Sequence, residues 1–222
     1  ILGRLGADAL AGIALVFPLS MLMMQMSAGG IGGATTAAVA RALGAGRSED
    51  ASRLAQQALF IAAVLAALFM VALLGFGRGI FGGMGGRGAA LDAALAYANV
   101  LFSGAVVIWF TNVLAAVVRG AGNMLLPSVL LLGTAVLHLV LCPLLVFGWG
   151  PVPGLGVAGA AVSTLVVNGA SALVMVAHLM RRDGPVQLQR SPWRLHAPLV
   201  RDILRVGLPA SMSPVISNAS IA

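Results

Sequence analysis

Two stripes of polar side chains, each inside an otherwise apolar stretch, are the residues of this sequence best suited to bind a small molecule or an ion. Within each stripe the residues are three or four positions apart, so a helix would present them on one face. They are Thr134, His138 and Cys142 in one stripe, and Thr164, Asn168 and Ser171 in the other. A polar group that faces hydrocarbon without a partner is costly, so both stripes are expected to face a bundle interior or a water-filled cavity.

Further polar side chains lie deep in other apolar runs, namely Ser27 and Asn112. For these hydroxyls and amides the simplest role is an ordinary hydrogen bond between helices. His138 is different, because an ionisable residue at membrane depth is a functional candidate by default. Two interpretations of His138 stay open: a core imidazole with a satisfied hydrogen bond, or a functional titrating group.

The sequence argues against an enzyme. It contains neither an HExxH nor a GxSxG motif, and it has no lysine. Its three histidines are far apart and it has one cysteine, so neither a metal site nor a catalytic residue is expected, and no cofactor. All acidic residues lie at the ends of the apolar runs or between them: Asp8, Glu49, Asp50, Asp92, Asp183 and Asp202.

The elements that must position these side chains are membrane helices. Of the 222 residues, 60% are hydrophobic and 9% are charged, with a mean hydropathy of +1.03. Soluble domains contain about 25% charged residues. The uncharged runs predict an all-α polytopic membrane helix bundle with five complete transmembrane helices and a truncated sixth that begins near residue 206. The five complete helices are expected at about 10–40, 51–76, 93–118, 124–147 and 157–180.

The arginines predict the orientation. Ten of the thirteen lie in connections on one side of the predicted bundle, after the first, third and fifth helices. The positive-inside rule then places these Arg-rich loops in the cytoplasm of a multi-pass protein of the cell inner (plasma) membrane. The formal charge of +7 is therefore an orientation signal, and we expect no nucleic-acid partner.

Three regions follow from this pattern: a lobe at 1–180, a cytoplasmic connection at 181–205, and a truncated helix of a second lobe at 206–222. Both ends look cut, so we expect a piece of a longer protein. Leu199 and Ile203 share a face in the connection, which predicts a short amphipathic surface helix from 195 onward, with Trp193 at the membrane interface. A solvated linker is the alternative.

The first predicted helix contains Gly29, Gly30, Gly32 and Gly33. Small residues four apart, such as Gly29 and Gly33, let membrane helices approach closely. We therefore favour helix packing over a phosphate-binding loop, because no strand pattern precedes these glycines.

Five segments, taken in order along the chain, resemble the N-terminal half of a multidrug and toxic compound extrusion (MATE) transporter. The longest, 147–161, reads FGWGPVPGLGVAGAA and is similar to the segment before the family's sixth helix. The other four are 3–12, 40–47, 119–123 together with Pro127, and 207–210. The resemblance implies that the five complete helices are the family's helices two to six and that the truncated one is its seventh, the first of a missing C-terminal lobe.

This resemblance implies a secondary active antiporter that works by alternating access. Small organic, drug-like and often cationic compounds would leave the cell as protons or sodium ions enter. Two alternatives remain. A lipid-linked oligosaccharide flippase of the same superfamily would need several basic residues in its cavity, and a non-transporting membrane scaffold would use the polar stripes only for helix packing.

The resemblance also implies site residues. The family's acid in helix one would lie before Ile1. Sodium-binding members have Asn, then Asp four residues later and Pro, where this sequence has His138, Cys142 and Pro143. Because a hard cation prefers oxygen ligands, this difference favours proton coupling, although sodium remains possible. The family's threonine in helix six corresponds to Thr164, and the positions that resemble cavity-lining ones are Met24, Ser27, Asn112 and Asn168.

Overall fold

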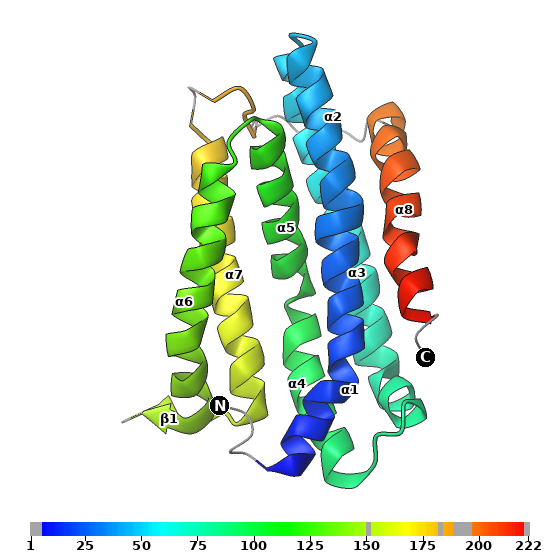
Figure 1. Cartoon of the computed structure of the whole chain (residues 1–222), viewed down its shortest axis with the longest axis vertical. Coiled ribbons are helices and arrows are strands. Elements are labelled where there is room, and N and C mark those ends of the chain that lie inside the picture. The colour runs from blue at the N-terminus through cyan, green and yellow to red at the C-terminus, as the bar shows by residue number, and fades with distance from the viewer. Residues whose placement is uncertain (1–5, 150–151, 182–183, 189–196, 220–222) are drawn as a thin grey trace.

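A computed structural model describes residues 6–149, 152–181, 184–188 and 197–219 of the chain. In these residues the fold is an all-α bundle apart from one short β-hairpin, in which each strand has two residues. This confirms the predicted class (Figure 1). The elements are α1 Ala7–Met24, the π-helix η2 Gln25–Ile31, α2 Gly32–Gly44, α3 Ser48–Gly83, α4 Gly88–Ser103, α5 Ala105–Gly120, α6 Leu125–Phe147, β1 Gly148–Trp149, β2 Val152–Pro153, α7 Val157–Leu179 and α8 Ala197–Ala219.

Four helical segments in the described residues are long and apolar enough to cross a membrane, and there are five if a bent pair counts as one span. The four are Ala7–Gly44, Ser48–Gly83, Leu125–Phe147 and Val157–Leu179, and the bent pair is α4 with α5. The helices were therefore predicted at the correct places, although most are longer than expected. The outward face of α6 shows why a membrane is needed: it exposes large apolar side chains such as Leu132, Val136 and Leu139.

The third predicted span, at 93–118, is a helix pair bent by 50°. The bend lies at Gly104, between α4 and α5. The side chain of Leu165 on α7 contacts Gly104 so closely that a Cβ atom there would overlap it. Because glycine has no side chain, the bend lets α7 pack into the inner side of this span.

In the first span, the glycine-rich stretch is where the helix changes to a π-helix, η2. The close contact with another helix is made by Gly30, which faces Ser211 of α8. A Cβ atom at Gly29 or at Gly33 would meet no other atom within 4 Å, so the packing predicted for this pair is made by its neighbours instead. One cause is the π-helix itself, because its wider turn changes the face on which each glycine falls.

Near the C-terminus the structure contains one helix, α8, where we expected a surface helix followed by a separate membrane span. Ile203 is completely buried, and Leu199 packs on the same core. The apolar stripe is thus covered by the bundle rather than by a membrane surface. The start of the predicted surface helix at 195 and Trp193 lie outside the described residues, and the division into lobe and connection remains a prediction.

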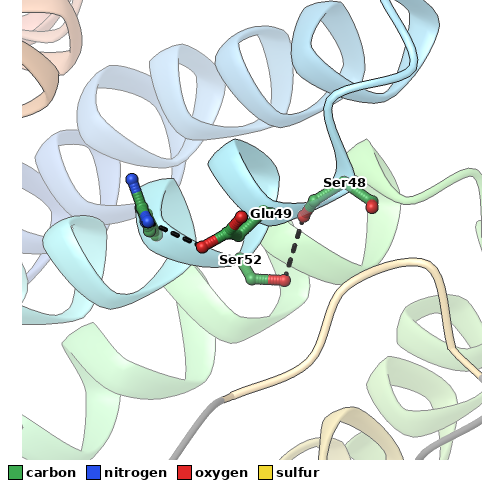
Figure 2. A network of polar contacts seen from close by, with 4 residues as sticks. Ser48, Glu49 and Ser52 are labelled. Atoms are coloured by element: carbon green, nitrogen blue, oxygen red, sulfur yellow. Dashed lines mark hydrogen bonds and ion pairs between the residues drawn. The ribbon is translucent and has the colours of Figure 1, made fainter. Parts of the chain in front are cut away.

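The connections that carry most of the arginines lie at one end of the bundle, the upper end in Figure 1. At this end α3 begins with Ser48, Glu49 and Ser52 (Figure 2). Glu49 pairs with Arg53 at 2.6 Å, and the Ser52 hydroxyl donates to the Ser48 carbonyl oxygen. The backbone N–H of Gln187 donates to Ser52 Oγ at 3.1 Å, so residues 184–188 are held against the first turn of α3.

The packing of α1 on α4 gives a direct test of this fold. A Cβ atom at Gly12 would lie 2.7 Å from the backbone nitrogen of Ala94 and 2.8 Å from the carbonyl oxygen of Ala90. Backbone atoms cannot move aside cheaply, so Gly12→Ala in the full-length protein should lower the free energy of unfolding by about 1–3 kcal/mol. Thermal denaturation in detergent would measure the change. Gly33→Ala is the matched control, since its Cβ meets open space, and equal losses for the two variants would contradict the packing.

Candidate functional site

A cavity of about 190 Å³ lies between the first span and helices α5, α6 and α7. Three of the residues that we expected to line a cavity do so: Met24, Asn112 and Asn168. Further neutral polar side chains and apolar side chains complete the wall, together with one guanidinium group. These remaining lining residues are Thr111, Ala115, Arg119, Pro127, Ser128, Leu130, Leu131, Ser171 and Met175.

Asn112 is held in place by the first span. Its Nδ2 donates to the hydroxyl of Ser27 at 2.8 Å, and that hydroxyl in turn donates to the carbonyl oxygen of Met24 at 3.1 Å. Ser27 is completely buried, so it supports Asn112 rather than facing the cavity. The pair links α5 to η2 at the point where the helix widens.

Asn168 and its neighbours link α5 to α7. Oγ1 of Thr111 lies 2.8 Å from the carbonyl oxygen of Val107 and 3.0 Å from that of Asn168, and its one hydrogen can donate to either. Asn168 Nδ2 donates to the carbonyl oxygen of Thr164 at 2.8 Å. The Thr164 hydroxyl bonds back to Ala160 within its own helix, so Thr164 acts here through its backbone.

A second polar group lies apart from the cavity, between α6 and α7. Nδ1 of His138 is 3.0 Å from Oγ of Ser163, and that oxygen is also 2.9 Å from the carbonyl oxygen of Ala160. The Ser163 hydroxyl has one hydrogen, and the acceptor to which it donates depends on whether Nδ1 of the imidazole is protonated. When Nδ1 is protonated it donates to Ser163, which then donates to Ala160; when Nδ1 is unprotonated it can accept from Ser163. The pair can hold either protonation state of His138.

Cys142 lies one turn further along α6 and is buried. It packs with Val146 and Ala160, and Tyr97 of α4 packs against this small cluster. The third member of the α6 stripe, Thr134, bonds only to the carbonyl oxygen of Leu131 in its own helix, at 2.7 Å. Of the two stripes, Asn168 and Ser171 therefore line the cavity, whereas His138 and Cys142 lie apart from it and Thr134 and Thr164 bond within their own helices.

Several residues near these sites were not predicted, among them Thr111, Arg119, Ser163 and Tyr97. Tyr97 is the sole tyrosine of the sequence and lies within an apolar span, a signal that could have been used. Ser163 is next to Thr164, but the chosen i, i+4 spacing pointed to the neighbouring face. Arg119 ends its span, and nothing in the sequence shows that its side chain borders a cavity.

The described residues contain no group of three His, Cys, Asp or Glu side chains that could hold a metal ion. The three ion pairs among them join exposed side chains outside the cavity, at the helix ends. The cavity and the His138 group are therefore lined by neutral hydrogen-bonding groups, one guanidinium, one imidazole and one thiol.

A bundle of membrane-length apolar helices, with a cavity that has a mostly apolar wall and a few polar groups, is an architecture found in polytopic membrane transport proteins. Residues 1–144 match the MatE family, and the chain belongs to this family. Its helices also agree with the predicted resemblance in order and placement.

Two curated relatives match nearly the whole chain. It is 27% identical to "Probable multidrug resistance protein YoeA" of Bacillus subtilis (strain 168), over 97% of this chain and 47% of the relative. It is 25% identical to "FAD transporter" of Shewanella oneidensis, over 100% of this chain and 50% of the relative. The chain thus spans about half the length of the relatives it matches.

Two solved structures of a multidrug resistance MATE family transporter have the same fold over this length. The inward-facing conformation matches with a TM-score of 0.88 and 32% identity, over 96% of this chain and 48% of the other. The outward-facing conformation matches with a TM-score of 0.88 and 31% identity, over 97% of this chain and 47% of the other.

The Ser27–Asn112 hydrogen bond can be measured by a double-mutant cycle in the full-length protein. Hydrogen bonds between membrane helices contribute about 0.6 kcal/mol on average, so Ser27→Ala and Asn112→Ala should couple by about that amount in unfolding titrations. Ser20 bonds only within its own helix, so Ser20→Ala should be additive with Asn112→Ala. Additivity of Ser27→Ala with Asn112→Ala would show that the bond is not formed.

Proposed function

We propose that this chain forms the N-terminal lobe of a secondary active exporter of small organic compounds. Family membership and the interior cavity support this function. One relative is named as a transporter and another as a probable multidrug resistance protein, which supports a role other than catalysis. Its partners are then the lipid bilayer, the exported compound and the second lobe of the same protein.

Alternating access is supported by the two structural matches. The chain fits the inward-facing and the outward-facing conformation equally well, with a TM-score of 0.88 in each. A lobe that keeps one internal structure in both states moves as a rigid body, so the substrate pathway opens and closes at the junction with the other lobe. With the Arg-rich end in the cytoplasm of the inner membrane, export runs away from Arg41 and Arg47.

We infer that export is coupled to protons through His138. Ser163 can accept a hydrogen bond from the protonated imidazole and donate one to the neutral ring, so both states of a proton carrier have a partner. Cys142 supplies sulfur where sodium-binding members have a carboxylate, and this weakens the case for sodium.

Neither alternative function gains support. A lipid-linked oligosaccharide flippase would need several basic groups for a pyrophosphate, whereas Arg119 is the one basic residue among the described residues that line the cavity. A scaffold would need no cavity, and its helices could pack closely throughout.

The coupling proposal predicts a loss of pH dependence. Export of an organic dye by the full-length protein in a pump-deficient strain, measured with cationic ethidium and with an anionic dye, should vary with pH, and His138→Asn should flatten this dependence because asparagine cannot titrate. His178→Asn is the control, since His178 lies in the last turn of α7, away from Ser163. A pH profile that is unchanged in His138→Asn would refute proton coupling through this residue. Absence of efflux of ethidium and of other organic dyes at every pH would count against export itself.

A further inference from the structure

Arg119 is the one charged residue among the described residues that line the cavity. It lies in the last turn of α5 and its side chain is half-buried. It forms no ion pair with any residue that the structure describes, and it differs from the other unpaired arginines of these residues, such as Arg41, in lining the cavity. A guanidinium that is partly removed from water and lacks a counter-ion favours the approach of an anion.

Two amide groups elsewhere in the same cavity wall have spare donor hydrogens. Asn112 and Asn168 each use one Nδ2 hydrogen, for Ser27 and for Thr164 respectively, and each amide retains a second one. A guanidinium matches the oxygen atoms of a carboxylate or phosphate, and the amides can bind other polar atoms of the same ligand. No acidic side chain among the described residues lines the cavity to compete with such an anion.

The same cavity offers an apolar surface. Met24 and Met175 border it from the first span and from α7, and Leu130 and Leu131 border it from α6. Methionine side chains adapt to flat or irregular apolar groups. The wall therefore combines one positive group with flexible apolar contacts, which suits a molecule that has both an anionic group and an apolar body.

We propose that this cavity binds amphipathic organic anions, and that Arg119 pairs with their carboxylate or phosphate group. The proposal rests on the proposed export function and names its substrate class, which differs from the often cationic compounds that the family resemblance implies. Arg119 also lies at the Arg-rich end, where it is placed to capture an anion that enters from that side.

The alternative role for Arg119 is that of an orienting arginine whose head group points to water and whose stem covers apolar surface. Arg41, in the last turn of α2, is an exposed arginine of this kind at the same end of the bundle. The two arginines contribute equally to the charge of that end, so they form a matched pair for an experiment that separates ligand binding from orientation.

The test is direct binding of two dyes to the full-length protein in phosphatidylcholine nanodiscs, followed by fluorescence anisotropy. Carboxyfluorescein is anionic and rhodamine 123 is cationic, and both have a xanthene core. Carboxyfluorescein should bind more tightly than rhodamine 123. Arg119→Gln should weaken carboxyfluorescein binding about tenfold or more and leave rhodamine 123 unchanged or slightly improved, since a charge-assisted hydrogen bond is lost. Arg119→Lys should retain most of the affinity, and Arg41→Gln all of it.

Three results would overturn the proposal: preferential binding of rhodamine 123, binding of neither dye, or equal carboxyfluorescein affinity in Arg119→Gln and the unchanged protein. If Arg119→Gln does not fold, two other measurements test the proposal. They are the relative affinity of the unchanged protein for the two dyes and the affinity of Arg119→Lys for carboxyfluorescein. The binding assay needs no ion gradient, so it tests the anion site separately from export. If the protein binds carboxyfluorescein but exports no dye, only the proposed export function is contradicted. If the protein exports dyes but binds the anionic and the cationic dye equally well, only the proposed anion site is contradicted.

Discussion

Hydrocarbon offers no hydrogen bonds, so every polar group inside a membrane span must find a partner within the protein or in enclosed water. This constraint accounts for the arrangement of the bundle. Thr35 bonds back to Ile31 in its own helix, Thr36 reaches the carbonyl oxygen of Ala116, and Asn112 reaches Ser27. Among the buried side chains that the structure describes, Trp109 Nε1 alone lacks a hydrogen-bond partner, and nothing in the structure explains it.

The close helix contacts determine where the cavity can form. Gly104 bends the α4–α5 span around Leu165, and Gly30 admits Ser211 of α8, so glycine sets two approaches of the bundle. The remaining space lies near the Arg-rich end, whereas the His138–Ser163 pair lies apart from it. Under the proposed function this separation gives one place for the exported compound and another for the coupling proton. The two sites share α6 and α7, which provides a structural route for coupling between them.

Much of the fold could be predicted because apolar length, charge position and arginine bias act locally along the sequence. The spans and their order follow from such signals, and Asn112 and Asn168 stand out as polar residues within spans, whereas Met24 was expected from the family resemblance alone. The bend at Gly104 could not be predicted, because its cause is the Leu165 side chain, which lies far along the chain. The same holds for Arg119, whose place at the cavity depends on how α6 and α7 pack beside it. Helix α8 shows the opposite error: its apolar stripe predicts contact with a membrane surface, but Ile203 is buried against the bundle.

The central claim is that the polar stripe of α7 faces an aqueous cavity while its apolar face meets lipid. Cysteine accessibility in the full-length protein tests it most directly, in a Cys142→Ala background with a water-soluble maleimide. Asn168→Cys should react, because it is partly exposed at the cavity and thiols ionise and react in water. Leu173→Cys should stay unlabelled although Leu173 is 72% exposed, because its surroundings are hydrocarbon. Labelling of Leu173→Cys at the rate of Asn168→Cys, or no labelling of Asn168→Cys, would contradict the account.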